Sequence, residues 1–170
     1  MPAAPVRASR TEPLMEFEIT EEHEGVGEIG AGVRDGIRNA DPPDVGRRDY
    51  LPLALGLRDG AGALRGGAYG ATMWGWLMLD GLRIAPELRR RGHGARLLAA
   101  AEAVAQKRGC RGVWLGTFDF QARSFYEGRG YSVYGQLPDF PAGHTHFQLA
   151  KRFGADQDGA SGFSPTPSRP

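Results

Sequence analysis

The spacing of apolar residues along the chain predicts alternating strands and helices between residues 14 and 153. Residues 14–20 alternate between apolar and polar side chains, as a half-buried strand does. Residues 21–39 carry apolar residues at helical spacing, although each glycine among them costs about 1 kcal/mol relative to alanine. Three further strands are predicted over residues 50–58, 63–72 and 74–84, the first two joined by a tight turn at residues 59–62.

The strongest helical pattern covers residues 92–108. Its apolar side chains form one stripe, which is typical of a helix with one buried face, and Gly109 is a suitable residue to end it. The order of elements, β-α-β-β-β-α-β-α-β-β, predicts an α/β (or α+β) domain in which helices cover a mixed sheet. The apolar stripe consists of Leu97, Leu98, Ala101, Val104 and Ala105. After this helix, the sequence predicts a strand at 112–117, a helix at 122–129 and strands at 131–137 and 145–149.

Both ends of the chain differ in composition from this central part. Residues 1–13 are rich in Pro and Ala, and residues 154–170 are rich in Gly, Ser and Pro. Neither segment can bury enough apolar surface to offset the entropy of ordering it. We therefore expect flexible tails on either side of one domain at residues 14–153. Within that domain, Gly66 and Gly67 indicate a bulge or a close approach of another backbone segment.

Charge and cysteine content exclude several classes of protein. The net charge is +1, so no overall field attracts nucleic acid or an anionic membrane. The one cysteine, Cys110, excludes an intramolecular disulfide and a cysteine-based metal cage, and no metal is expected. No apolar run approaches the roughly 20 residues of a membrane-spanning helix, and the first residues lack the apolar stretch of a signal peptide. A soluble cytoplasmic protein is therefore expected.

A candidate anion-binding segment, here called the cradle (residues 89–95), precedes the strongest helix. The first turn of a helix has backbone N–H groups without intrahelical partners, which a Ser, Thr, Asp or Asn usually caps. Uncapped donors, the positive end of the helix dipole and glycines that admit a close ligand indicate a phosphate site, although arginine runs are also typical of solvated surfaces. No Gly-Lys-Ser/Thr motif of a P-loop is present. The cradle consists of Arg89, Arg90, Arg91, Gly92, His93, Gly94 and Ala95.

Two motifs in the right order resemble those of one enzyme superfamily. The pattern Arg89-x-x-Gly92-x-Gly94, after a strand that ends Leu82-Arg83-Ile84, is similar to the acetyl-CoA motif of the GNAT superfamily of N-acetyltransferases. Residues 122–131 are similar to the helix and glycine-aromatic turn that follow the fifth strand in that superfamily. Three further segments resemble a group of small bacterial GNAT proteins: Gly66-Gly67, Phe120-Gln121-Ala122 and Pro141-x-Gly143-His144.

The resemblance implies the acyl-CoA N-acyltransferase fold, a mixed and mostly antiparallel sheet of six or seven strands flanked by helices. It also implies acetyl-CoA as co-substrate, with its pyrophosphate on the cradle amides and its pantetheine arm paired with Leu82 and Ile84 in an opening of the sheet. Asp119 stands where many relatives carry an asparagine that helps to hold the cofactor. The implied cofactor-binding residues are Leu82, Arg83, Ile84, the seven residues of the cradle, Asp119 and Tyr126.

The implied reaction is direct attack of an amine on the thioester carbonyl. A lysine-like amine has a pKa of about 10.4, so a base must help to deprotonate it, and the leaving thiolate (pKa roughly 8.5 by analogy with Cys) departs more easily with a proton donor. Tyr126 is the candidate donor, although it can equally serve in packing. Asp80 has the strand parity of the two residues that pair with the cofactor and is the candidate base, with His144 and His146 as alternatives.

Several positions are candidates for the acceptor site. Trp74 and Trp76, at strand spacing, and His144 are expected to line it, although such aromatics are more often part of a core. The segments at 21–49 and 137–146 are expected to shape its entrance. The resemblance leaves open a homodimer formed through the sheet or the last strands.

Two other functions remain open on the sequence alone. A non-catalytic acyl-CoA-binding regulatory module would keep the cradle and lose turnover, and the missing asparagine and the undefined base leave room for it. A nucleic-acid-binding domain that uses the three cradle arginines would need several phosphate contacts on one face, which the net charge of +1 disfavours.

Overall fold

The computed structural model describes residues 19, 21, 26–46 and 48–154. The chain divides into two compact units, residues 1–45 and 46–170. In the first unit, α1 (Val26–Asn39) lies within the helix predicted at 21–39 and is followed by a 3-10 helix, η1 (Pro43–Val45). The strand predicted at 14–20 and the two predicted tails lie almost entirely outside the described residues. No helix in the described ranges has the length and apolar character needed to cross a membrane.

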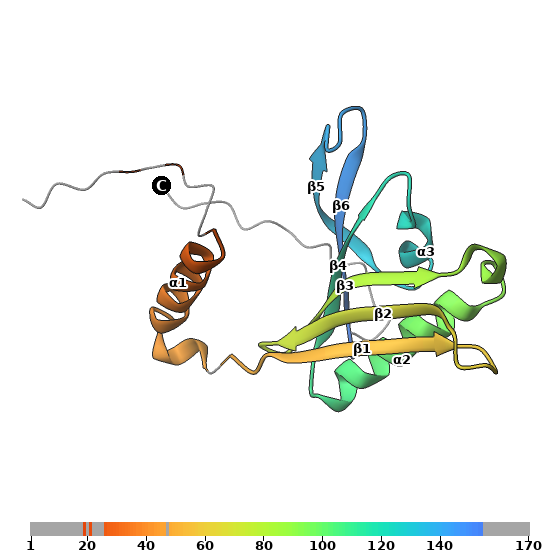
Figure 1. Ribbon diagram of the computed structural model, residues 1–170, viewed down its shortest axis with the longest axis horizontal. Helices are drawn as coiled ribbons and strands as arrows, with labels where there is room; N and C mark the ends of the chain where they lie inside the picture. Colours follow the sequence, from red (N-terminus) through yellow and green to blue (C-terminus); the bar gives the residue numbers. More distant parts are fainter. Residues whose placement is uncertain (1–18, 20, 22–25, 47, 155–170) are drawn as a thin grey trace, which may run out of the picture. The chain divides into compact units, whose positions relative to one another are not determined.

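The second unit is built on one six-stranded sheet with the strand order β1-β2-β3-β4-β6-β5 (Figure 1). β3 and β4 are parallel, and all other neighbouring strands are antiparallel. The mixed, mostly antiparallel sheet that the resemblance implies is therefore confirmed. The strands are β1 (Leu51–Arg58), β2 (Leu64–Met73), β3 (Trp76–Ile84), β4 (Gly112–Phe118), β5 (Ser132–Pro138) and β6 (Thr145–Arg152).

The hairpin between β2 and β3 corrects one predicted boundary. The strand predicted at 74–84 begins at Trp76, because Trp74 (φ 50°) and Gly75 (φ 72°) form the two-residue turn between the strands. Positive φ at both central residues gives a hairpin turn the twist of its strands. The Trp74 N–H donates to the Asp49 carboxylate at 2.7 Å, which helps to hold this turn. Apolar spacing alone did not reveal it, because a tryptophan seldom adopts the left-handed conformation.

Gly66 and Gly67 lie where neighbouring backbones come close, as predicted. A Cβ atom added to Gly66 would lie 2.6 Å from the carbonyl oxygen of Arg83 on β3. One added to Gly67 would lie 2.9 Å from the carbonyl oxygen of Leu55 on β1. Any larger residue would therefore force the strands apart. The pairing of β1 with β2 also shifts by one residue next to Leu57, so the predicted irregularity is confirmed.

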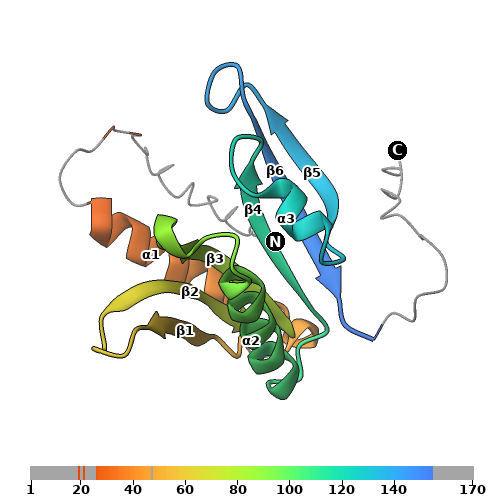
Figure 2. The same ribbon diagram turned by 90° about the vertical axis from the view of Figure 1, so that its right-hand side faces the viewer.

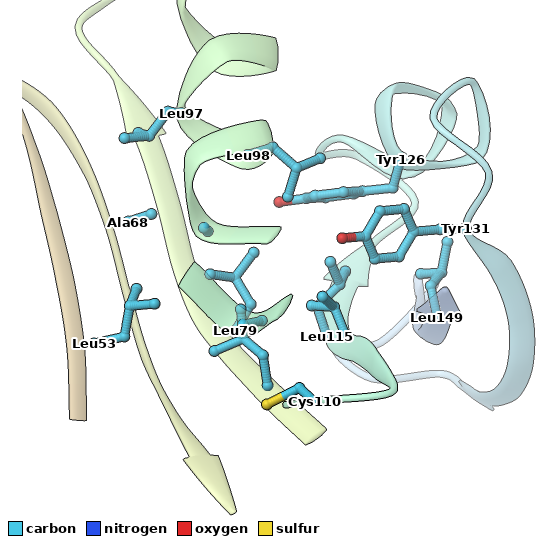
Figure 3. Packing of buried hydrophobic residues seen from close by; sticks show 14 of the residues in the cluster. Leu53, Ala68, Leu79, Leu97, Leu98, Cys110, Leu115, Tyr126, Tyr131 and Leu149 are labelled. Carbon is cyan, nitrogen blue, oxygen red and sulfur yellow. The ribbon is translucent and has the colours of Figure 1, made fainter. Parts of the chain in front are cut away.

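α2 (His93–Lys107) covers one face of the sheet from β1 to β4 (Figure 2). It buries four of the five residues of the predicted apolar stripe, and the fifth, Val104, is partly buried. Leu98 and Ala101 are 1% and 0% exposed and belong to one core cluster with Leu115 of β4. Leu98 lies beside the ring of Tyr126, which α3 (Arg123–Glu127) contributes (Figure 3). Because this core is closely packed, Leu98→Ala should cost about 2–5 kcal/mol of stability.

A polar network ties α2 to β6 and to the residue before β5. The Tyr131 hydroxyl donates to Glu102 at 2.9 Å, and Lys151 Nζ donates to both oxygens of the same carboxylate at 3.1 and 2.9 Å. Burial, reinforced by the Glu102 charge, raises the pKa of Tyr131 far above its ordinary value, so this phenol stays protonated. The ring of Tyr131 meets that of Tyr126 edge-on at 5.7 Å. The network therefore fixes the aromatic neighbours of Tyr126.

Candidate active site

The cradle ends in a helix without a side-chain cap. The 3-10 helix η2 (Pro86–Leu88) leads into it, and Gly92 is the N-cap of α2, with φ 81° and ψ −8°. The first donor within the helix is the Arg96 N–H, which bonds to the Gly92 carbonyl at 3.1 Å. The amides of residues 93–95 therefore have no acceptor in the helix. Glycine suits position 92, because the left-handed conformation costs other residues roughly 1–2 kcal/mol.

These amides border a cavity of about 740 Å³, here called the first cavity. From the cradle, Arg89, Arg90, Gly92, Gly94 and Ala95 line it. The remaining wall comes from β3 and from α3 with its flanking residues. Free amides, the positive end of the helix dipole and two guanidinium groups thus face one space. This arrangement fits a pyrophosphate.

Two residues of the cradle point elsewhere. Arg91 is exposed and does not line the first cavity. The His93 side chain lines a separate cavity of about 180 Å³ with Gly56 and Leu57 of β1, and its Nδ1 is buried without a hydrogen-bond partner among the described residues. The resemblance implies His93 as a cofactor-binding residue, but its side chain does not line the first cavity. Successive side chains on a helix are turned by ~100°, so His93 and Gly94 face different directions.

β3 and β4 diverge toward one end (Figure 2). A second cavity of about 590 Å³ lies where they part. The parallel pairing covers only residues 77–79 of β3 and 113–115 of β4, although both strands continue. Beyond this point, residues 80–84 of β3 and the end of β4 line the second cavity. The two cavities share several lining residues, Tyr126 among them, so they adjoin.

The edge of β3 that faces this separation has backbone groups without a strand partner. The Ala85 N–H donates to the Arg65 carbonyl on β2 at 2.8 Å. Because backbone groups alternate in direction along a strand, Leu82 and Ile84 direct their N–H and C=O groups toward the side that β4 has left. The Ile84 carbonyl accepts one bond there, from Arg89 Nε at 3.3 Å. An extended ligand with amide groups can pair with this edge as an added strand would.

Asp80 reaches the second cavity through a bulge. The pairing of β2 with β3 passes from Gly81 to Leu79 between consecutive residues of β2, so Asp80 has no partner. Such an extra residue reverses the alternation of side chains between the two faces of a strand. Leu82 and Ile84 therefore face the core, as Leu79 does. The predicted parity of Asp80 with them is therefore wrong, although its predicted place near the cleft is observed. Its exposed carboxylate makes no hydrogen bond or ion pair with any described residue.

Tyr126 lies on the wall that both cavities share. It is 7% exposed and lies edge-on to Phe125, with ring centroids 5.0 Å apart, and to Tyr131. Within the described part of the chain its hydroxyl has no hydrogen-bond partner. Burial raises the pKa of Tyr126 above its ordinary value. The phenol is therefore protonated at neutral pH and can donate.

Comparison with known proteins identifies the family. Residues 20–131 match the model of the Acetyltransferase (GNAT) family. The chain belongs to the GNAT family. It is similar to blasticidin-S acetyltransferase of Streptomyces morookaense, at 40% identity over 119 residues, which are 69% of this chain and 82% of that protein. It is also similar to acetyltransferase Atu2258 of Agrobacterium fabrum strain C58, at 32% identity over 126 residues, 74% of this chain and 92% of that protein.

A solved GNAT-type structure has the same architecture. The crystal structure of an acetyltransferase from Bacillus cereus matches with a TM-score of 0.71 and 30% identity, and covers 80% of this chain and 97% of its own. The acyl-CoA N-acyltransferase fold that the resemblance implies is therefore confirmed. As a GNAT member, the protein is an acetyl-CoA-dependent acetyltransferase.

Two predicted residues of this GNAT protein hold a loop and line neither cavity. Asp119 accepts a hydrogen bond from the Thr145 N–H at 3.1 Å, and its other oxygen lies 3.1 Å from His144 Nδ1. Desolvation raises the pKa of Asp119, but hydrogen bonds from the Thr145 and Phe120 amides and from His144 outweigh it and hold the pKa below its ordinary value. The His144 ring contacts the ring of Phe120 edge-on, with centroids 4.8 Å apart, and Phe120 in turn lines the second cavity. Nowhere in the described ranges do three or more potential metal ligands gather.

Trp74 and Trp76 lie at the opposite end of β3 from the cavities. The Arg48 guanidinium lies 4.7 Å from the ring centroid of Trp74, and the Arg152 guanidinium lies 5.1 Å from that of Trp76. Neither tryptophan lines either cavity. At 3.3 Å per residue, Trp76 is about 20 Å from Leu82 along the strand. The structure therefore does not bring the two tryptophans to the predicted acceptor site.

The sequence did not assign a role to several residues that line the cavities. Gln121 and Ala122 line both, and Phe120 lines the second. Arg129 lines the first, and its guanidinium lies 3.8 Å from the ring centroid of Phe125. The signal that could have found residues 120–122 is their place in a short connection between a buried strand and a helix, where functional side chains concentrate.

Proposed function

We propose that this protein transfers the acetyl group of acetyl-CoA to a primary amine of a small molecule, by direct attack within a ternary complex. The observation that carries the proposal is the uncapped amino terminus of α2, which borders a cavity that continues past Tyr126 into a second one. The second cavity, at about 590 Å³, falls in the size range of small-molecule sites. The similar blasticidin-S acetyltransferase supports an acceptor of this kind.

The cradle and β3 would hold the co-substrate. The free amides of residues 93–95, with Arg89 and Arg90, would bind the pyrophosphate. The open edge at Leu82 and Ile84 would pair with the amides of the pantetheine arm. Acetyl-CoA supplies an acyl group activated on a thiol that can leave. Binding in this manner directs the thioester to the place where β3 and β4 separate, next to Tyr126.

Asp80 and Tyr126 would move the two protons of the reaction. Among the described residues that line the second cavity, Asp80 is the one with an acidic side chain. Asp80 would take a proton from the attacking amine, directly or through water, as the C–N bond forms. Tyr126 would give its proton to the sulfur as the C–S bond breaks, and would regain one from solvent. Protonation of Tyr126 at neutral pH suits it to this role.

A turnover assay with the full chain tests the proposal. Release of the CoA thiol would be followed with acetyl-CoA and a panel of primary amines, with the N-acylated form of each amine as its matched control. We expect thiol release with at least one primary amine and none with its acylated control. Binding of acetyl-CoA without turnover of any amine would favour the non-catalytic module instead.

A further inference from the structure

Gln121 has a side chain that its surroundings hold in one orientation. It precedes α3 and lines both cavities. Its Oε1 accepts the backbone N–H of Phe118 at 3.2 Å and the hydroxyl of Thr117 at 3.3 Å. The Thr117 hydroxyl also accepts the N–H of Ala122 at 3.4 Å, which helps to hold it beside Gln121. Both lone pairs of Oε1 are therefore in use.

This network also determines which end of the Gln121 carboxamide faces the cavities. A backbone N–H can only donate, so the atom opposite the Phe118 amide is the oxygen, and Nε2 lies on the other side. The two hydrogens of Nε2 have no acceptor among the described residues. The wall near Tyr126 thus presents a neutral group with two donors and no free acceptor.

Such a group suits a carbonyl oxygen better than the other partners available. In the proposed complex, the pyrophosphate would already have the cradle amides and the two arginines that line the first cavity. An attacking amine must keep its lone pair for the acyl carbon, and a donor that bonded to it would oppose the reaction. The remaining hydrogen-bond acceptors of acetyl-CoA near Tyr126 are two carbonyl oxygens. One belongs to the thioester, and the other belongs to the nearest amide of the pantetheine arm.

We infer that the Gln121 carboxamide donates a hydrogen bond to one of these carbonyl oxygens and so sets the position of the acyl group relative to Tyr126. The inference rests on the proposed function, because it requires acetyl-CoA to lie in the two cavities. Gln121 is then a binding residue fixed in advance by Thr117 and Phe118. A neutral hydrogen bond of this kind changes affinity by roughly two- to tenfold.

Two substitutions separate this role from that of a loop contact. Gln121→Glu keeps the oxygen for Phe118 and Thr117 but replaces the donors with an oxygen that repels a carbonyl. Gln121→Met removes the donors without adding charge, and also removes the loop contact. The matched control is Gln136→Glu, which makes the same change at an exposed position of β5 outside both cavities. Thermal melting would check that each variant folds.

Calorimetric titration with acetyl-CoA gives the decisive comparison. We expect Kd to rise roughly fivefold in Gln121→Met, roughly tenfold or more in Gln121→Glu, and less than twofold in Gln136→Glu. Weaker acetyl-CoA binding in Gln121→Met alone would show that Gln121 acts only through its loop contact. Weaker binding in Gln121→Glu alone would show a charge effect. Unchanged binding in both variants would show that Gln121 does not contact the ligand. Each of these three results overturns the inference.

A second titration with CoA, which lacks the acetyl group, distinguishes the two carbonyls. If the substitutions weaken acetyl-CoA and leave CoA unchanged, the partner is the thioester oxygen. If both ligands weaken equally, the partner is the amide of the arm. A wild-type protein that fails to bind acetyl-CoA would instead overturn the proposed function, whereas normal binding by the wild type and by both Gln121 variants would overturn this inference alone.

Discussion

The cradle and the second cavity are built from different chemical groups. The cradle presents backbone amides, and it needs a left-handed glycine at position 92 and the absence of a capping side chain. The second cavity presents side chains. A bulge in β3 positions Asp80, and a hydrogen-bonded connection before α3 positions Gln121. The cradle therefore depends on backbone conformation, and the second cavity depends on individual side chains.

This difference predicts how each region responds to substitution. Exchange of a side chain in the cradle leaves the helix amides in place, so the effect on binding should be graded. Exchange of a proposed catalytic side chain at the second cavity would remove a proton donor or acceptor outright, so the effect on turnover should be large while binding of acetyl-CoA persists. Substitutions in both regions separate the two kinds of response.

Tyr126→Phe should have the largest effect on turnover. It removes the proposed proton donor but keeps the ring that packs against Phe125 and Tyr131. We expect kcat to fall roughly 100-fold, because general acid catalysis contributes about 10²–10⁴-fold, and Kd for acetyl-CoA to stay within about threefold of wild type. Tyr50→Phe, at an exposed position outside both cavities, is the control. An unchanged kcat in Tyr126→Phe would assign Tyr126 to packing alone.

The pH dependence of the rate tests the same donor in the wild type. If Tyr126 is the donor, its protonated phenol is the active form, and burial raises the pKa of Tyr126 above its ordinary value of 10.0. Loss of its proton should therefore not reduce the rate below that pH. The measurement is kcat from pH 6 to about 10. An alkaline fall that begins near pH 8 in the wild type and is absent in Tyr126→Phe would show that this phenol loses its proton there, and would contradict the raised pKa.

Asp80→Asn should have the next largest effect. It keeps the size of the side chain but removes the proposed base, so kcat/KM at neutral pH should fall roughly 10- to 100-fold. Higher pH should recover part of this loss, because an amine with a pKa of about 10.4 then loses its proton to solvent. The readout is kcat/KM against pH for both proteins. Equal profiles would exclude Asp80 as the base.

Arg90 and Arg91 give a smaller and matched comparison in the cradle. Arg90 lines the first cavity and Arg91 does not, although they are adjacent and both exposed. We expect Arg90→Ala to weaken acetyl-CoA binding roughly tenfold and Arg91→Ala less than twofold, because charge-assisted bonds to phosphate need direct contact. Calorimetry at two salt concentrations would check this. Equal losses would indicate a general attraction rather than a contact.

Asp119→Asn should have the smallest effect. The pKa of Asp119 lies below its ordinary value of 3.8 in the folded protein. The carboxylate therefore stabilises the fold above that pH, and this contribution is lost as the pH falls through the folded-state pKa. The variant should be slightly less stable than wild type at pH 7, and the difference should disappear once the pH has fallen below the folded-state pKa. Thermal melting against pH measures it. A large loss of acetyl-CoA binding would instead restore Asp119 as a cofactor contact.

The parts of the molecule that follow a repeating pattern could be predicted. The apolar stripe of α2 repeats with the helical period, and Leu97, Leu98, Ala101 and Ala105 are buried as expected. The uncapped start at Gly92 could also be read, because the residue types that cap helices are missing from the cradle. Both inferences depend on local sequence alone.

The parts that depend on a single irregular residue could not be predicted. One unpaired residue, Asp80, reverses the alternation of β3, and apolar spacing does not show where such a bulge falls. The left-handed turn at Trp74 is equally hidden, because tryptophan has no preference for it. Asp119 was assigned by its place in a motif, and its partners in the chain, His144 and Thr145, are more than 20 residues away.

Two glycines at the ends of α2 allow the most direct test of the proposed acetyl-CoA site. Gly92 (φ 81°) and Gly109 (φ 74°) flank opposite ends of this helix, and an added Cβ would meet no other residue within 4 Å at either position. Gly92→Val and Gly109→Val therefore add similar backbone strain, but only the first changes the cradle. Calorimetric titration with acetyl-CoA should show Kd at least roughly 100-fold higher in Gly92→Val and close to wild type in Gly109→Val. Wild-type affinity in Gly92→Val would contradict the assignment of the cradle as the acetyl-CoA site.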